Sequence, residues 1–539
     1  MALRKQHPVR FAPKGLNDAY DSTDAFPGAC RSLQNLIFDE GNPELVVCRP
    51  GVVMLTDFVG FNTPTFVTVH ISIGDMEYGM VSTALTPGYD EPFAYNVATD
   101  TFIAIAGVVA GNVPASPPLT GPWVPPSMAV VGTKILVAHS GFSGAGTNFI
   151  GVIDIAVPAA PVWSSANLAT NVLPSVPTVV ANFNNRAYYA CGNIAYFSDV
   201  LVPLTRTNAS QSLTVGNPTP IIAMVGLPIQ TTSSGIVQAL TIFKEIQIWQ
   251  VTGDLVTTNL LLNWVSLTTG TVAPRTVVQT SFGIVFMATN GPYVVDAVGQ
   301  IRLLSFSTDT TQHDLQNPFI YCTIPSRASA GYNTGIYRIC VDAYLNGFEM
   351  RAEYWFDTDR RRWNGPHTWP VDCSSAVGNY FVVSHARNGA MLCRSQVIQD
   401  FSSVYSDHGT PLYFSVESST LPKDATMTEK QVVESTVELS TAGQQVTYKV
   451  EALTEKLVVM NTVYIVVNSL AYLWGAFFWG VGYWSSTINI PSVYTVPWTG
   501  PLVFQKMAIR ISGQSSSNIT IGSFFARYQD TGYTNMQTP

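Results

Sequence analysis

Short hairpins recur along the middle of the chain at intervals of about 40 to 50 residues, and this recurrence constrains the fold more than any other feature. Residues 236–305 show the pattern most clearly. Apolar and polar side chains alternate over 246–251, and a period of two is typical of a strand with two unlike faces. Asn290-Gly291 separates two apolar runs and favours a type I′ turn. The segment therefore predicts antiparallel strands joined by tight turns.

Further hairpins are expected on both sides of this segment. They cover residues 66–83, 92–105, 134–156, 184–199, 336–364 and 380–395. A succession of short antiparallel strands at this spacing is typical of the blades of a β-propeller. The stretch from residue 61 to residue 400 leaves room for about six or seven irregular blades. The sequence carries no WD or kelch signature, so the predicted repeat is one of architecture.

The predicted fold is all-β and has three parts. Residues 1–60 form an N-terminal arm, in which 27–37 is expected to be a short helix because its apolar residues fall on one side. Residues 61–400 form the β-propeller. After residue 400 the strand patterns become longer and amphipathic, which predicts a C-terminal β-sandwich or platform domain over 401–539. A Trp/Gly-rich loop lies within that domain at 463–486.

The charge content of the chain is unusually low. Charged residues make up 12% of the sequence, whereas ordinary soluble domains carry about 25%. A surface with so few charges is expected to be rich in hydroxyl and amide groups, or to be covered by other subunits of an oligomer. The net charge of −8 argues against a general phosphate-binding surface. It leaves open a pore through which DNA passes without being held.

The cysteines and the N-terminus favour a protein made in a cytoplasm. The seven cysteines are odd in number and form no C-x-x-C pair, which is typical of reduced thiols. The first fifteen residues contain no apolar core of signal-peptide length, so export by that route is not expected.

One apolar stretch raises the question of a membrane. Residues 463–484 are long enough to span a bilayer. However, Trp474, Trp479 and Trp484 recur every five residues, with glycines between them. This pattern favours a packed hairpin or loop tip, and the three tryptophans are candidates for a tip or assembly loop. Contact of such a tip with a membrane stays open.

The sequence shows no convincing catalytic, cofactor-binding or metal-binding constellation. The seven histidines are scattered and lack H-E-x-x-H spacing. Ser143 lacks the second glycine of a nucleophile elbow, because position 145 is alanine. No phosphate-binding P-loop is present. We therefore expect no catalytic residues, no cofactor and no metal, and a protein that is not an enzyme.

Arg360, Arg361 and Arg362 form the only basic run in the chain, and Trp363 follows them directly. Basic side chains beside an aromatic ring are one signature of nucleic-acid binding. These four residues are therefore candidates for a DNA-channel or interface site. The favoured interpretation is plainer, namely a solvated turn or a turn between subunits.

Three short patterns resemble those of a known family. An "N-L…R-P-G" pattern opens the chain, a hairpin R-x-x-φ-x-x-G-x-x-φ-x-φ-S (φ apolar) follows, and a later hairpin ends aromatic-x-x-T-G. The matching residues are Asn35, Leu36, Arg49, Pro50 and Gly51, then Arg186, Gly192, Phe197 and Ser198, then Trp249, Thr252 and Gly253. Together they resemble the tail nozzle or tail-hub proteins of short-tailed bacteriophages, of the tail tubular B and packaged-DNA-stabilisation types.

The resemblance implies a structural virion protein, made in the host cytoplasm and located in the tail of the virion. Such proteins form a ring, usually of six subunits, below the portal and its adaptor. The ring extends the DNA channel, closes it, and allows genome ejection. The implied partners are other copies of the chain, the portal-adaptor protein, tail fibre or tail needle proteins, and double-stranded DNA that passes without sequence readout. Two alternatives stay open: a glycan-binding or glycan-degrading β-propeller of a phage tail, and a membrane-active tail tip.

Overall fold

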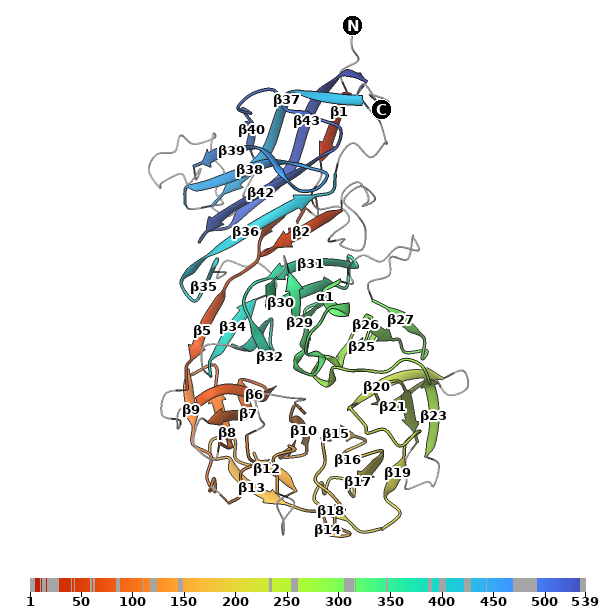
Figure 1. The fold of residues 1–539 in the computed structure, drawn as a ribbon. Helices are drawn as coiled ribbons and strands as arrows, with labels where there is room; N and C mark the ends of the chain where they lie inside the picture. Colours follow the sequence, from red (N-terminus) through yellow and green to blue (C-terminus); the bar gives the residue numbers. More distant parts are fainter. Residues whose placement is uncertain are drawn as a thin grey trace.

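The computed structural model describes most of residues 5–533 (Figure 1). Within that range the description omits residues 10, 12–15, 17–28, 40, 43, 59–60, 62–63, 84–87, 110, 117–123, 144–148, 232–234, 254–259, 305–314, 316, 346–347, 386–389, 397–403, 421–427, 443 and 469–491. Strands dominate the described part. Its helices are short: α1 (Asn317–Ile320), η2 (Pro274–Thr276) and η3 (Pro325–Arg327).

Figure 1 shows a ring of small sheets below a group of long strands. The ring contains seven antiparallel units of four strands among the described residues, and we call them blades 1 to 7 in chain order. Blade 1 is β6 (Pro64–Ile73), β7 (Met76–Thr83), β8 (Asp90–Asn96) and β9 (Thr101–Ile103); blade 2 is β10 (Ser127–Val131), β11 (Lys134–Ala138), β12 (Ile150–Asp154) and β13 (Val162–Ala166); blade 3 is β15 (Val179–Phe183), β16 (Arg186–Cys191), β17 (Ile194–Phe197) and β19 (Ser212–Thr214).

The remaining blades follow the same plan. Blade 4 is β20 (Ala223–Thr231), β21 (Gly235–Phe243), β22 (Ile248–Thr252) and β23 (Leu261–Ser266); blade 5 is β24 (Val278–Thr280), β25 (Gly283–Ala288), β26 (Gly291–Val295) and β27 (Ile301–Leu303); blade 6 is β28 (Ser329–Asn333), β29 (Ile336–Leu345), β30 (Phe348–Asp357) and β31 (Arg362–His367); blade 7 is β32 (Val371–Val377), β33 (Tyr380–His385), β34 (Leu392–Gln396) and the N-terminal strand β5 (Val52–Thr56). A short parallel pair, β14 (Ala169–Thr170) and β18 (Thr205–Arg206), flanks blade 3.

The ring closes between blades 7 and 1. The first strand of each blade contacts the first strand of the next, and β32 contacts β6. A buried polar cluster reinforces this contact, since Ser375 of β32 donates to the Glu77 carboxylate at 2.9 Å and Glu77 lies 2.9 Å from Nδ1 of His70. No single sheet runs round the ring. The predicted β-propeller is therefore confirmed as a set of separate radial sheets with a strand from the N-terminal region completing the last blade.

Apolar layers between the blades hold the ring together. Alternate residues of each strand face one neighbouring blade or the other, as period-two patterns require. Phe58, Phe93 and Phe102 pack between blades 7 and 1, for example, with ring centroids about 5 Å apart. Equivalent clusters lie between most of the other neighbouring blades. The layer between blades 5 and 6 is part of a larger core that extends into the long strands above the ring. Burial of these faces is the main favourable term that stabilises the ring.

Two long sheets form the upper part of Figure 1, which we call the platform. One sheet continues from blade 6 through β2 (Cys30–Gln34), β36 (Thr410–Ser418), β42 (Met507–Ser515), β38 (Val446–Thr454) and β39 (Val459–Val467), with β35 (Ser406–Asp407) paired to β36. The other contains β3 (Leu36–Phe38), β4 (Val46–Cys48), β43 (Ile519–Tyr533), β37 (Thr428–Thr441) and β40 (Ser492–Thr495), with β1 (Lys5–Val9) and β41 (Val503–Phe504) attached. Their facing sides share one core with part of blade 6.

The expectation of a helix at 27–37 is wrong for the residues that the structure describes. Cys30–Gln34 is strand β2, which pairs with β36 and meets β31 of blade 6 at Leu33 and Gly365. Asn35 then adopts a φ of 53°, which turns the chain into β3. Tertiary pairing overrides the helical spacing of the apolar residues here.

The turn predicted at Asn290-Gly291 falls one residue earlier. Ala288 pairs with Gly291, so Thr289 and Asn290 form the two-residue loop between β25 and β26. Gly291, with a φ of 129°, opens the second strand. The hairpin itself is confirmed.

No helix in the described residues is long and apolar enough to cross a membrane. The Trp/Gly-rich loop at 463–486 belongs to the described part only as far as Asn468, and β39 accounts for most of that portion. Trp474, Trp479 and Trp484 lie outside the described residues.

Candidate functional site

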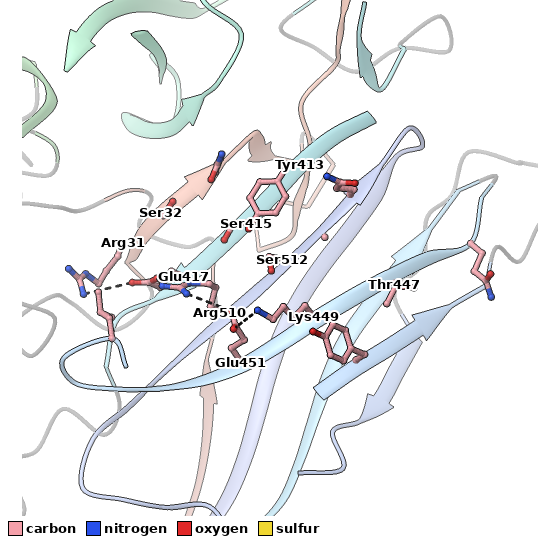
Figure 2. A pocket seen from close by; sticks show the side chains of 16 residues that line it. Arg31, Ser32, Tyr413, Ser415, Glu417, Thr447, Lys449, Glu451, Arg510 and Ser512 are labelled. Atoms are coloured by element: carbon pink, nitrogen blue, oxygen red, sulfur yellow. Dashed lines mark hydrogen bonds and ion pairs between the residues drawn. The ribbon is translucent and has the colours of Figure 1, made fainter. Parts of the chain in front are cut away.

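A hollow on the open face of the platform sheet is the candidate site, and we call it the platform groove. It encloses a volume of about 960 Å³ and crosses β2, β36, β42, β38 and β39 (Figure 2). Its lining residues are Arg31, Ser32, Gln34, Tyr413, Ser415, Glu417, Gln445, Thr447, Lys449, Glu451, Leu457, Tyr464, Arg510, Ser512, Gly513 and Gln514. Polar side chains therefore dominate the groove, and Leu457 is its single aliphatic member.

Strand register explains why these residues share one surface. Side chains two apart along a strand point to the same face. Three strands carry polar residues at every second position. Of these strands, β42 lies in the middle and pairs antiparallel with β36 and with β38. These positions are 413, 415 and 417 on β36, 510, 512 and 514 on β42, and 447, 449 and 451 on β38. The residues between them, such as Phe414, Val450 and Ile511, face the platform core.

An ion-pair ladder runs across the groove (Figure 2). Arg510 donates from Nε and Nη2 to one oxygen of Glu417, at 2.9 and 2.7 Å. Its Nη1 lies 3.6 Å from Glu451, whose other oxygen is 2.6 Å from Nζ of Lys449. Arg31 lies 3.8 Å from the second oxygen of Glu417. Three cations and two carboxylates thus alternate across four strands.

The ladder fixes the charge states of its cations. Burial alone would lower the pKa of Arg510, but the Glu417 and Glu451 carboxylates raise it above the ordinary value. The hydrogen bond from Lys449 to Glu451 raises the pKa of that lysine. Both cations stay charged at neutral pH, and each is part of an ion pair. The groove carries a dense array of charged groups with little net charge.

Two tyrosine rings stand at opposite sides of the groove. Tyr413 lies on β36 and Tyr464 on β39, with β42 and β38 between them. Tyr413 is 43% exposed and Tyr464 is 65% exposed, so both rings can contact a ligand. Amide, hydroxyl and lysine side chains lie between the rings, and the arginine and carboxylates of the ladder lie beside them. The arrangement can bind a polar molecule with some apolar surface.

The basic run at 360–362 is placed at the turn between β30 and β31. Arg360 forms an ion pair with Asp357 at 2.7 Å, Arg362 lies over the ring of Phe38 at 5.7 Å, and Arg361 is exposed. Trp363, in contrast, is a core residue, 1% exposed. It packs on Phe356 and Phe319 in the core shared with the platform. Its ring is closed to nucleic acid, so the four residues do not form one surface.

The first family-like pattern forms the junction between the propeller and the platform. Nε of Arg49 donates to Oδ1 of Asn35 at 3.0 Å, and its Nη1 donates to Asp407 at 2.9 Å. The amide of Asn35 donates to Thr368, which follows blade 6, and Asp407 accepts the backbone N–H of Val52 in blade 7 at 3.2 Å. Arg49 is 2% exposed. These contacts tie two blades to the platform, and we call them the junction.

Gly51, the last residue of the N-L…R-P-G pattern, lies at a close contact between two segments of backbone. A Cβ atom on Gly51 would lie 2.1 Å from the backbone oxygen of Ser406, so only glycine fits where the chain passes β35.

The second family-like pattern, the hairpin at 186–198, is also structural. Arg186 donates to the carbonyl of Ser198 at 2.8 Å, and the Ser198 hydroxyl accepts the N–H of Ala187 at 3.0 Å. The motif residues thus shape the scaffold and lie apart from the platform groove.

The described residues contain no group of three His, Cys, Asp or Glu side chains that could hold a metal ion. None of the seven cysteines forms a disulfide bond, and burial raises the pKa of the Cys48 thiol to about 12. The platform groove was not predicted from the sequence. Its signal was the polar residue at every second position in three strands, but the sequence does not say that those strands are neighbours.

No family model and no curated protein matches the chain. Solved structures do, at the level of the fold. They include the β-propeller domain of the Trilobed protease from Pyrococcus furiosus (11% identity, TM-score 0.34, 63% of this chain and 100% of that one). An exo-beta-1,3-galactanase from Phanerochaete chrysosporium has 9% identity and a TM-score of 0.24, with 74% and 95% covered. A beta-fructofuranosidase from Schwanniomyces occidentalis has 8% identity and a TM-score of 0.27, with 89% and 98% covered.

These likenesses correct one expectation. We expected a protein that is not an enzyme, because the sequence shows no catalytic constellation. The similar structures include a galactanase and a fructofuranosidase, so that expectation is overturned. The class, a β-propeller protein, follows from the seven blades of the chain itself, and the comparisons define nothing narrower.

Proposed function

We propose that the chain is a structural subunit of the tail hub of a short-tailed bacteriophage, assembled as a ring that extends the DNA channel. The observation that supports this proposal is the junction. Asn35, Arg49 and Gly51, which carry part of the family resemblance, are the residues that join the propeller to the platform.

The junction suits a subunit that must transmit force within a ring. A buried arginine with carboxylate and amide partners holds its neighbours in one geometry, because every alternative leaves a buried charge unpaired. Low charge also suits this function. A ring of identical subunits buries two different surfaces of each copy, and a charge-poor surface lowers the cost of desolvation.

The oligomeric state of the purified chain tests the ring. Native mass spectrometry is expected to give a closed multiple of 58.4 kDa, with six copies as the favoured number. Negative-stain images of the same sample should show a ring with a central opening. A monomer at every concentration, also in the presence of a phage portal-adaptor complex, would rule out the proposal.

A glycan-directed function is the second candidate, and the platform groove is the observation that favours it. The groove combines exposed tyrosine rings with arginine, carboxylate, amide and hydroxyl groups on one open surface. Binding of the chain to a glycan array, followed by a search for released sugar with each bound glycan, tests this candidate. Absence of both binding and release would remove it. The two candidate functions are compatible, since a ring subunit can also carry a glycan-binding surface.

A further inference from the structure

The charge balance of the platform groove limits the ligands that it can take. Glu417 and Glu451 are 9% and 5% exposed, and both are in contact with Arg510. An anionic ligand would have to compete with these carboxylates for the same cations. A cationic ligand would compete with Arg510 and Lys449 for the carboxylates. Either exchange leaves a charge in a poorly solvated place without its partner, which is costly.

A neutral polar ligand meets no such cost. Arginine has five N–H donors, and each carboxylate has about four acceptor positions. Arg510 uses Nε and Nη2 on Glu417, and the carboxylates keep further lone pairs for another donor. Adjacent hydroxyl groups of a sugar can act as donor and acceptor at once. They can join the ladder without separating any of its ion pairs.

The hydroxyl and amide groups of the groove extend this pattern. Ser415, Ser512 and Thr447 lie on three neighbouring strands, and Gln34 and Gln514 add amides near the Tyr413 side. Each hydroxyl is both a donor and an acceptor, and each amide offers both kinds of group. A molecule with many hydroxyl groups can therefore find partners across the whole groove.

The tyrosine rings provide the apolar part of the contact. Tyr413 and Tyr464 are separated by three strand spacings, or roughly 14 Å. The groove volume of about 960 Å³ is at the upper end of the range for small-molecule sites. One sugar ring cannot reach both tyrosines, but a chain of several sugar rings can. Tyrosine is well suited to this contact, because its ring is rigid and combines an apolar face with a polar tip.

From these observations we propose that the platform groove binds a neutral oligosaccharide chain that runs across the strands from Tyr413 to Tyr464. Gln514, Ser512, Thr447 and Lys449 supply hydrogen bonds between the two rings, and the ion-pair ladder lies along one side of the oligosaccharide chain. The inference rests on the glycan-directed candidate function and gives it a site and a ligand class. It does not depend on ring assembly.

Isothermal titration calorimetry with the full-length protein tests the proposal. The probes are a neutral series (cello-, manno-, malto- and galacto-oligosaccharides of one to seven units) and an acidic series (oligogalacturonides and heparin fragments). We expect binding of at least one neutral series, with affinity that rises with chain length until both tyrosines are reached. Binding confined to the acidic series would overturn the proposal.

Three variants locate the site. Tyr464→Ala and Tyr413→Ala should each weaken binding about tenfold, since each removes one ring from the contact. Tyr344→Ala is the matched control, because Tyr344 is 60% exposed on β29 and does not line the groove. It should leave affinity unchanged. The three melting temperatures should match that of the unmodified protein, because all three side chains are exposed.

The outcomes separate the site from the function. If a neutral oligosaccharide binds and both groove variants bind it with unchanged affinity, the glycan-directed function stands but its site lies elsewhere, and the inference falls. If no saccharide of either series binds, both fall together. Loss of affinity in the groove variants alone supports both.

Discussion

Charged networks of similar chemistry occur in the propeller and in the platform groove, but their cations differ in burial. In blade 6, Arg338 donates from Nε and Nη2 to both oxygens of Glu353, at 2.7 and 2.8 Å, and the two side chains are 2% and 4% exposed. In the groove, Arg510 and Lys449 are 29% and 39% exposed. The Arg338–Glu353 pair is buried and therefore acts only within the scaffold. Arg510 and Lys449 are partly exposed and can therefore also contact a ligand.

A second network of buried ion pairs in the propeller connects residues of several blades. Arg275, which lies in η2 between blades 4 and 5, donates to the carbonyl of Arg327 at 2.9 Å and to Asp372 of blade 7 at 3.2 Å. Arg351 of blade 6 donates to Asp342 at 2.7 Å and lies 3.5 Å from the same Asp372. Several blades are thus linked through one set of charges. Networks of this kind define a single arrangement of the blades, since any other arrangement would break several contacts together.

The largest effect is expected where a buried pair is broken. Arg338→Met leaves Glu353 as an unpaired buried carboxylate and should lower the free energy of unfolding by about 3–5 kcal/mol. The matched change in the groove, Arg510→Met, should cost less, about 1 kcal/mol, because Arg510 is itself 29% exposed and Arg31 and Lys449 remain beside the two carboxylates. Urea unfolding followed by tryptophan fluorescence measures both.

The double variant Arg338→Met/Glu353→Leu sharpens the test. Removing both charges should recover much of the lost stability, because neither partner is then left unpaired. Equal losses for Arg338→Met and Arg510→Met would contradict the distinction between buried and exposed networks.

The junction should give the next largest effect. Gly51→Ala places a methyl group against the backbone of β35, where no side-chain movement can relieve the clash. We expect a loss of about 1–3 kcal/mol, the usual cost of overpacking. Gly111→Ala is the control, because a Cβ atom there meets nothing within 4 Å. Should both variants unfold at the same denaturant concentration, the close passage at Gly51 is not a constraint on the fold.

The blades could be predicted from the sequence because each is built from strands that follow one another. Turn residues and period-two patterns are local signals, and in 236–305 they located the hairpins to within one residue at the Thr289–Asn290 turn. Closure of the ring by β5 could not be predicted, since β5 pairs with β34 across more than 300 residues of sequence.

The platform was predicted as a β-sandwich or platform domain of residues 401–539, without the strands of the N-terminal region that belong to its sheets. Leu33 and Leu36 have helical spacing, and the strand form of 30–38 depends on pairing with β36 and β4, which is set by the tertiary structure. The platform groove was missed for a related reason. Its three polar patterns, such as 413, 415 and 417, are visible in the sequence, but their adjacency comes from the strand order β36, β42, β38.

The buried histidine beside the junction should make stability depend on pH. Burial, with the nearby Arg49 and Arg338, holds the pKa of His367 well below its ordinary value. Below about pH 6.5 the unfolded chain binds a proton at this position and the folded chain does not, so acid favours unfolding. This group should lower the free energy of unfolding by up to about 1.4 kcal/mol for each pH unit below 6.5.

The variant His367→Gln should have a shallower fall in stability between pH 6.5 and 5 than the unmodified protein. His408→Asn is the control, because His408 is exposed and should leave the slope unchanged. Unfolding free energies at half-unit pH steps measure the three slopes. Identical slopes for His367→Gln and the unmodified protein would show that His367 is not neutral in the folded state.

The smallest effect on stability is expected in the basic turn at 360–362, where Arg361 is exposed. Arg361→Gly should change the free energy of unfolding by less than about 0.5 kcal/mol, because the side chain is exposed and glycine tolerates its φ of 53°. Trp363→Leu, two residues along, removes a buried ring from the core shared by blade 6 and the platform and should cost about 2–4 kcal/mol. Thermal unfolding of the two variants side by side tests whether burial decides the role of each residue even within one short motif. A large loss for Arg361→Gly would mean that the turn has a structural partner, and the distinction between buried scaffold and free surface would fail there.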